Sequence, residues 1–459
     1  MTSPSPSTST AVTPSGRVVS TRRVLVVCLF GMAAGSFPIT VLSASIPEIA
    51  TDLSTTKATA NWVLSAPILV FAVVTPIAGK LGDLYGHRRI YLSGYAAAVV
   101  VLALTPFARS IGELIALRTL AQAASSVTAP AAMAFIITLF EGKARSKALG
   151  YWTAVAAISP SVGVIVGGPL VDLTSWRVLF VMQTGLALLA LVLAIPVLPE
   201  TDRRPDIRFD IPGAVTLGLA VGSFLFGLNR IRVWGIDDPL IITCLVVAPI
   251  MAVAFVAIER RAEAPLVPLS MVRQRGFAVA IVAQALVSGA YMGGFVVTPL
   301  LLEGVFGYST TVIAFIMLPR PFAFGAASTA SGHLESRLGI RTLVMAGGTI
   351  LGAALVAVAV SASAGLVVGV VLGIAFSGIG QGLTRPALVG SVGKAVDDQD
   401  LGVAGGLLQM SSQIGVAAGM TILTAIVGES ESPDTFFTVF MLAAAAGFGG
   451  AVAGRFLAD

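Results

Sequence analysis

The sequence predicts an all-α membrane protein with fourteen transmembrane helices, arranged as two six-helix halves and an extra helix pair. Hydrophobic residues make up 56% of the 459 residues and charged residues only 11%, whereas soluble domains carry about 25% charged residues. The mean hydropathy is +0.94. Apolar segments of the length that crosses a bilayer recur throughout the chain, and short basic connections separate them. We therefore expect a polytopic membrane protein.

Residues 1–23 are rich in Ser, Thr and Pro and offer too little apolar surface to fold, so we expect a disordered cytoplasmic tail. The predicted spans after the tail are 24–46, 62–79, 90–107, 112–140, 147–171, 177–198, 211–229, 239–259, 276–302, 309–332, 340–361, 364–391, 401–427 and 434–456. We assign 24–198 to an N-terminal six-helix half and 276–459 to a C-terminal six-helix half. Residues 199–275 form a linker with two extra transmembrane helices.

The distribution of Lys and Arg predicts the orientation. An even number of spans puts both termini on one side of the membrane. With the N-terminus inside, the outer connections hold only Lys57, Arg109, Arg177, Arg230 and Arg232, and most other basic residues are inside. By the positive-inside rule we expect a multi-pass protein of the cell (inner) membrane with both termini in the cytoplasm.

One basic connection has a distinctive pattern, Gly79-Lys80-Leu81-Gly82-Asp83-Leu84-Tyr85-Gly86-His87-Arg88-Arg89. Its glycines allow a tight turn, and Asp83 is a carboxylate that could accept N–H groups at a helix N-terminus. The pattern recurs at 332–341, where Ser336 replaces the carboxylate. The two halves are therefore internally repeated, and paired halves with a site between them are the common plan of secondary transporters.

This connection resembles the loop 2–3 signature of the major facilitator superfamily, and the resemblance covers almost the whole chain. The other matching residues are Ile46-Pro47, Ile49, Asp52-Leu53, Trp62-Val63, Arg118, Pro130, Gly150, Trp152, Pro160, Gly163, Gly167, Gly168, Trp176-Arg177, Leu179-Phe180, Phe209-Asp210 and Gly213. Together they resemble the fourteen-span drug:proton antiporter group. The chain departs from that group at Pro38, where helix 1 usually carries an aspartate, at Ala121-Gln122 and at Gly163-Val164.

The resemblance implies a monomeric secondary transporter that exports drugs or metabolites by alternating access and proton antiport. It implies a conformational switch at Gly79, Asp83, Gly86, Arg88, Arg89, Pro160, Gly163, Gly167 and Gly168. We expect Asp83 to hold the start of the helix near Leu401 in one conformation. Without a helix 1 aspartate, a carboxylate near a helix end must carry the proton. Glu303 is the first candidate and Glu48 the second, and Arg118 occupies the position associated with coupling.

Polar side chains in several spans recur every three or four residues, which places them on one helical face. Such a face turns to the bundle interior, because lipid cannot satisfy it. Helix packing alone is the alternative interpretation. We predict substrate contacts from Arg118, Gln122, Trp152, Gln284, Tyr291, Arg320, Gln381 and Gln413.

Three arginines lie at membrane depth without an Asp or Glu near the middle of any span: Arg118, Arg320 and Arg385. A charge at the bilayer centre costs about 2.5–3.5 kcal/mol on insertion scales. Arg385 is close enough to the inner surface to extend its charge toward water. Arg118 and Arg320 suggest an alternative function, the transport of an anionic metabolite or lipid.

The sequence gives little support to an enzyme or a receptor, because it contains no nucleophile–base pair, metal cluster or large soluble domain. Cys28 and Cys244 are too few for a disulfide framework, and His87 and His333 lie in separate loops. The net charge of +5 is spread among loops, which does not indicate nucleic-acid binding. We expect no cofactor or metal. The expected partners are the small-molecule substrate, the proton and the lipid bilayer.

Overall fold

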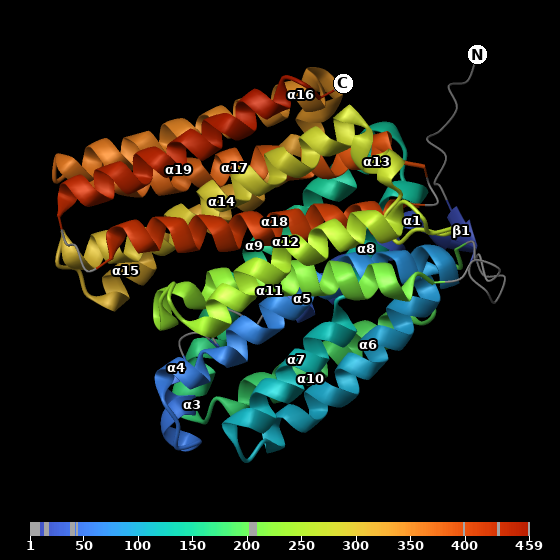
Figure 1. Cartoon of the computed structure of the whole chain (residues 1–459), viewed down its shortest axis with the longest axis horizontal. Helices are drawn as coiled ribbons and strands as arrows, with labels where there is room; N and C mark the ends of the chain where they lie inside the picture. The colour runs from blue at the N-terminus through green and yellow to red at the C-terminus, as the bar shows by residue number, and fades with distance from the viewer. Residues whose placement is uncertain are drawn as a thin grey trace. The chain divides into compact units, whose positions relative to one another are not determined.

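The computed structural model describes residues 10–12, 18–36, 42, 45–201, 209–397, 400–428 and 432–457, with residues 161–173 described as backbone only. The described chain is almost entirely helical (Figure 1). Its elements are β1 (Thr10–Val12), β2 (Val18–Ser20), α1 (Thr21–Ser36), α3 (Ile46–Asp52), α4 (Lys57–Ala60), α5 (Trp62–Tyr85), α6 (His87–Leu104), η1 (Thr105–Phe107), α7 (Ile111–Ser125), α8 (Thr128–Leu139), α9 (Gly142–Leu173), α10 (Arg177–Ala194), α11 (Ile211–Trp234), α12 (Pro239–Glu259), α13 (Leu269–Arg273), α14 (Arg275–Gly304), α15 (Thr310–Met317), α16 (Pro319–Ser363), α17 (Val367–Ala395), α18 (Leu401–Val427) and α19 (Pro433–Gly454).

Every predicted span contains a helix of the structure. In the described ranges, eleven helical segments are long and apolar enough to cross a membrane. One of them, Phe315–Ser363, contains two predicted spans, and the left-handed backbone of Gly339 (φ 79°) separates them. Helices α1 and α9 coincide with two further predicted spans, 24–46 and 147–171.

The N-terminal tail differs from the prediction of disorder. Strand β1 pairs antiparallel with β2, with Ala11 opposite Val19. Val19 is buried and packs in a cluster with Val24 and Val27 of α1. Valine favours extended backbone, and this burial compensates for the ordering of a short segment. The prediction was wrong for these two strands, and the rest of the tail lies outside the described residues.

The helices form two compact units. The first contains Met1–Ala148, Ser159–Arg208 and Asp398–Gly406, and the second contains Leu149–Ile158, Phe209–Asp397 and Leu407–Asp459. Helices α9 and α18 each contribute residues to both units, and the division into two six-helix halves stays a prediction. The extra pair, α11 and α12, belongs to the second unit, where the Thr421 hydroxyl donates to the Leu228 carbonyl at 3.0 Å.

In the first unit, α6 packs against α7 and α10, and α5 packs against α7. Tyr91 and Tyr95 of α6 are buried at its centre, and the Tyr95 hydroxyl donates to the Gly31 carbonyl of α1 at 3.2 Å. A second cluster surrounds Trp176, Phe180 and Ile49. These contacts hold the ends of α3 and α10 together.

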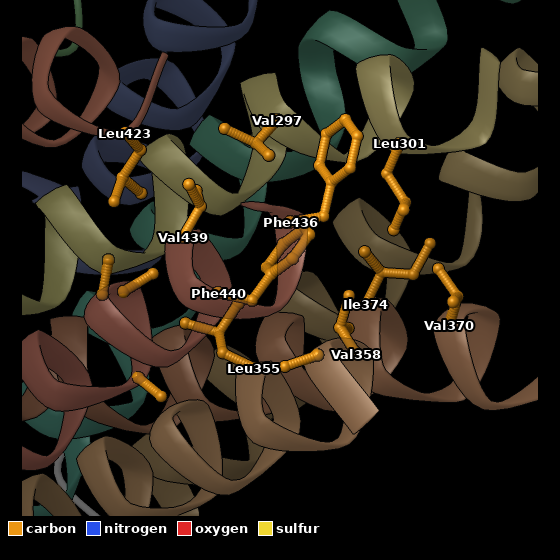
Figure 2. Packing of buried hydrophobic residues seen from close by; sticks show 14 of the residues in the cluster. Val297, Leu301, Leu355, Val358, Val370, Ile374, Leu423, Phe436, Val439 and Phe440 are labelled. Carbon is orange, nitrogen blue, oxygen red and sulfur yellow. The ribbon is translucent and has the colours of Figure 1, made fainter. Parts of the chain in front are cut away.

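In the second unit, α16 packs against α17 and α19, and α19 also packs against α14. Figure 2 shows Phe436 and Phe440 of α19 between Val297 of α14 and Leu355 of α16. These side chains are almost fully buried, and van der Waals packing between them holds the helices together, since lipid is as apolar as the side chains. This apolar layer fixes the helices that carry the polar residues described next.

Candidate functional site

Asp83 lies in the last turn of α5 and binds the first turn of α18. Its Oδ1 accepts the Gly402 N–H and its Oδ2 accepts the Val403 N–H, both at 2.9 Å. The first N–H groups of a helix have no partner within the helix and favour an anion. The contact predicted near Leu401 is therefore present within the first unit, and its role as a switch stays a prediction.

Close backbone packing makes this contact possible. A Cβ at Gly79 would collide with the Gly402 carbonyl, so α5 and α18 approach closely only because both positions are glycine. His87 Nε2 lies 3.1 Å from Asp83 Oδ1, and Lys80 Nζ lies 4.0 Å from Asp400 Oδ1. His87 therefore contacts the Asp83 carboxylate directly, while Lys80 pairs with the acid just before α18.

The remaining residues of the motif have separate structural roles. Gly86 has φ 92°, a left-handed conformation that ends α5 and starts α6. Arg88 ties α6 to the end of α10, because its Nε donates to the Leu198 carbonyl at 2.9 Å and its Nη2 to the Ile195 carbonyl at 2.8 Å. Arg89 is exposed.

The predicted helix 5 switch residues lie in α9. Pro160 is half-buried. The side-chain surroundings of Gly163, Gly167 and Gly168 lie outside the described structure, so their role stays a prediction. Elsewhere in α9, Gly150 packs against the backbone of Ser328 in α16 within the second unit.

Arg118 of α7 is buried in the first unit, with 5% of its surface exposed. Its Nη1 donates to Gln183 Oε1 of α10 at 3.1 Å, and its guanidinium carbon lies 5.3 Å from the centroid of the Phe180 ring. Among the residues that the structure describes, no acidic side chain forms an ion pair with it. Gln122, one turn further along α7, is half-buried, and Pro38 lies outside the described residues.

A polar group in the second unit joins α14 to α18. Gln284 Nε2 donates to the hydroxyls of Ser288 at 2.7 Å and Ser412 at 3.2 Å, and these two hydroxyls lie 2.9 Å apart. A Cβ at Gly289 would lie 2.7 Å from the Gly415 carbonyl oxygen, which shows how closely the helices approach. Gln284 Oε1 is buried and, within the described chain, has no hydrogen-bond partner.

Arg320, in the first turn of α16, is the most buried of the three arginines, with 1% of its surface exposed. Its Nη2 donates to the Tyr291 carbonyl of α14. Its guanidinium carbon lies 3.7 Å from the centroid of the Tyr291 ring and 4.9 Å from that of Phe295. The Tyr291 ring meets Phe324 edge-on, with centroids 5.6 Å apart. No described atom accepts a hydrogen bond from Arg320 Nε or Nη1.

Two helices add polar groups to the second unit. Gln381 of α17 is buried, and Arg385, one turn on, donates from Nη2 to Gln409 Oε1 of α18 at 3.2 Å. Arg385 is half-buried and binds another helix, and the expectation that its charge extends to water stays a prediction. Gln413 of α18 is half-buried, and Trp152 of α9 is buried.

Six of the eight predicted substrate residues thus belong to the second unit, and Arg118 and Gln122 belong to the first. Sequence reasoning missed Gln183. Gln183 was detectable as a buried amide in the middle of the predicted span 177–198. In the part of the chain that the structure covers, no group of three or more His, Cys, Asp and Glu could hold a metal ion.

The two proton candidates are both exposed. Glu303 lies at the end of α14. Glu48 lies in α3, and its Oε1 accepts the Trp176 N–H at 3.3 Å. Both acids lie near helix ends, where water reaches a carboxylate easily. The role of each acid stays a prediction.

Sequence reasoning also missed a buried acid, Glu259 at the end of α12. It is 4% exposed, and its Oε1 accepts the Val267 N–H at 3.4 Å. It lies beside Gly213 in the first turn of α11, whose N-terminus Asp210 caps.

Asp52, Trp176 and Arg177 form a clamp that joins α3 to α10. Asp52 Oδ2 accepts from Arg177 Nη1 and, at 3.1 Å, from Trp176 Nε1. Arg177 also donates to the carbonyls of Pro106 at 3.1 Å and Ala108 at 3.3 Å. The hydrogen bond from Arg177 holds the pKa of Asp52 below its usual value of 3.8.

Comparisons with known proteins agree with this architecture. A family model described as Major Facilitator Superfamily matches residues 24–420. The multidrug resistance protein Stp of Mycobacterium tuberculosis (strain CDC 1551 / Oshkosh) is 30% identical over 84% of this chain and 72% of its own length. The cephamycin export protein CmcT of Amycolatopsis lactamdurans is 30% identical over 89% of this chain and 88% of its own.

Among solved structures, the human organic anion transporter MFSD10 (TETRAN) has a TM-score of 0.68 over 95% of this chain and 99% of its own. Its sequence identity is 15%, so the likeness concerns the fold alone. All three comparisons extend over most of the chain, so they apply to its whole architecture.

Proposed function

Because the chain belongs to the Major Facilitator Superfamily, whose members are membrane transporters and not enzymes, we propose that it exports small, moderately hydrophobic molecules, drugs or metabolites, across the cell membrane. The observation that carries the proposal is the set of buried polar side chains in the second unit, at Gln284, Arg320 and Gln381. Polar groups at membrane depth are costly and face a bundle interior or a substrate path. The relatives named for multidrug resistance and cephamycin export support the same class of substrate.

Alternating access is the mechanism we propose. Asp83 forms two charge-assisted hydrogen bonds to the first turn of α18, and such bonds contribute about 1.5–3 kcal/mol each. A difference of this size changes the ratio of two conformations by roughly 10- to 150-fold. The contact would form in one conformation and break in the other. Helix α18 then continues into the second unit, which contains the polar residues.

Proton antiport is the coupling we propose, with Glu48 and Glu303 as the acids to test. Both are close to helix ends and exposed, so a proton can reach them from water. Arg118 would modulate the coupling from the first unit. Glu48→Gln and Glu303→Gln remove each titrating group at nearly constant shape, and a pH dependence of transport that is unchanged in both variants would exclude them.

Inverted membrane vesicles with an imposed, acid-interior pH gradient test the function. Vesicles that contain the protein should accumulate rhodamine 123 or ethidium faster than empty vesicles, and a protonophore should abolish the difference. Uptake that persists with the protonophore would contradict antiport. Uptake equal to that of empty vesicles for both dyes would contradict export of such compounds.

A further inference from the structure

The surroundings of Arg320 in the second unit suggest a more specific role than helix packing. A guanidinium has five N–H donors. Arg320 uses one nitrogen, Nη2, to donate to the Tyr291 carbonyl, while Nε and Nη1 have no acceptor in the described structure. The side chain is 1% exposed, so water does not take the place of a partner readily. A buried donor without an acceptor costs free energy, so we expect a partner in the functional cycle.

The charge of Arg320 is also uncompensated. Across the described ranges, neither Arg320 nor Arg385 forms an ion pair. Arg385 is half-buried and donates to a neutral amide, Gln409. Within the described structure, the Arg320 guanidinium thus contacts the Tyr291 ring without a carboxylate from the protein.

The rest of the surroundings is aromatic. Tyr291 and Phe295 lie one turn apart on α14 and present their rings to the Arg320 guanidinium at 3.7 Å and 4.9 Å. Phe324, one turn along α16, meets the Tyr291 ring edge-on. Aromatic rings provide apolar contact area with directional preference, and cation–π contact holds the guanidinium plane in position.

We propose that Arg320, with the rings of Tyr291 and Phe295, forms a subsite for the carboxylate of an aromatic acid. This inference rests on the proposed export function and specifies its substrate class. The planar guanidinium matches two carboxylate oxygens, which a lysine ammonium does not. Nη2 carries two hydrogens, one on the edge that it shares with Nε and one on the edge that it shares with Nη1. The Tyr291 carbonyl takes one of them, so one edge of Arg320 keeps both of its donors. The aromatic body of the substrate would pack against the rings.

Two dyes test this inference with the intact, purified protein. Rhodamine 123 is the methyl ester of rhodamine 110, so the pair shares one aromatic body and differs in the presence of a free carboxylate. Fluorescence anisotropy at pH 7 gives the dissociation constant of each dye. We expect the wild type to bind rhodamine 110 at least about tenfold more tightly than rhodamine 123, the effect of one charge-assisted hydrogen bond.

Substitutions then locate the effect. Arg320→Gln should weaken rhodamine 110 binding by about tenfold or more and change rhodamine 123 binding less than about twofold. Arg320→Lys should recover only part of the loss, because it keeps the charge but not the planar fork. Arg455→Gln, at an exposed arginine of the same unit, is the matched control and should leave both constants unchanged.

Two results with the wild type alone would overturn the proposal. One is equal affinity for the two dyes, and the other is that neither dye shows saturable binding. If Arg320→Gln lowers the affinity for both dyes by the same factor, Arg320 has a structural role. A transport assay in vesicles distinguishes failure of the subsite from failure of the proposed export function. Binding that prefers rhodamine 110 without transport contradicts export alone, and transport of rhodamine 123 without a preference for the acid contradicts the subsite alone.

Discussion

Asp83 has each carboxylate oxygen on a different backbone N–H, from Gly402 and Val403. Asp83→Asn would keep one acceptor and replace the other by an amide that points its own hydrogens at an N–H group. We expect transport of the vesicle dyes to fall by about tenfold or more, since a hydrogen bond to a charged group contributes roughly 1.5–3 kcal/mol. Immunoblots of the membrane fraction should show normal abundance.

The second copy of the motif offers the matched control for Asp83. Ser336 occupies the equivalent position, is exposed, and donates only to the His333 carbonyl within its own helix at 3.3 Å. Ser336→Ala should transport like the wild type. Full transport by Asp83→Asn would show that the contact is dispensable and would remove the proposed switch.

The clamp at Asp52 predicts a pH dependence of stability. Arg177 lowers the pKa of Asp52 below 3.8 in the folded protein, so its stabilisation is complete above that value and is lost as the pH falls through the lowered one. Because 43% of the Asp52 side chain is exposed, we expect no more than about 1 kcal/mol. The melting temperature of Asp52→Asn should lie slightly below that of the wild type from pH 5 to 8, and the difference should shrink below pH 4.

Asp237→Asn, in the loop before α12, is the control for this measurement, because Asp237 is exposed and outside the clamp. Its melting temperature should match that of the wild type over the whole pH range. A difference between wild type and Asp52→Asn that grows toward acid pH would contradict the assignment of the clamp.

At the scale of elements, the contact between α14 and α18 depends on glycine. A Cβ at Gly289 would lie 2.7 Å from the Gly415 carbonyl oxygen, which is backbone and cannot move aside. Gly289→Ala should therefore lower stability by about 1–3 kcal/mol, the usual effect of overpacking. A lower melting temperature of the purified protein, with loss of dye binding, is the expected result.

Gly276, in the first turn of the same helix, provides the comparison. A Cβ there would meet only the Ala395 side chain, at the ordinary distance of 3.9 Å. Gly276→Ala should leave stability unchanged or raise it by up to about 1 kcal/mol, because alanine favours helix. Equal destabilisation by both substitutions would mean that helix contact is not the cause.

Helix positions could be predicted from the sequence because lipid requires long apolar segments with internally satisfied backbones. The Asp83 contact could also be predicted, since one carboxylate among cations has few possible roles. The strand at Val18–Ser20 could not, because its stability comes from packing against α1. The amino-acid composition of the tail does not predict that tertiary contact.

The candidate site was predictable only in part. Polar spacing on single helices identified Gln284, Arg320 and Gln381, all of them buried. It could not identify partners on other helices, such as Gln183 for Arg118 or Gln409 for Arg385. Partners of this kind depend on helix rotation and tilt, which packing decides. The exposure of Glu48 and Glu303 depends on the same geometry.

At the scale of the whole molecule, α9 and α18 each contribute residues to both compact units. The first turn of α18 belongs to the first unit and the rest of the helix to the second, while residues 149–158 of α9 belong to the second unit. Each of these two segments contains a closely packed glycine, Gly402 in α18 and Gly150 in α9. A Cβ at either position would collide with backbone or with Asp83. Small residues permit such close helix contacts in lipid. Changes at these glycines should therefore affect the whole transport cycle.

Membrane topology gives the last prediction. In a background of Cys28→Ser and Cys244→Ser, single cysteines replace four exposed residues: Lys57, Asp237, Arg261 and Arg455. By the positive-inside rule, a membrane-impermeant maleimide should label Lys57→Cys and Asp237→Cys in intact cells, and Arg261→Cys and Arg455→Cys only after permeabilisation. Labelling after permeabilisation controls for reactivity at every position.

External labelling of Arg455→Cys would show that the protein has the opposite orientation in the membrane. Labelling of Lys57→Cys with protection of Asp237→Cys would remove α11 and α12 from the spans and reduce the count from fourteen to twelve. The pattern expected here requires that both extra helices cross the membrane.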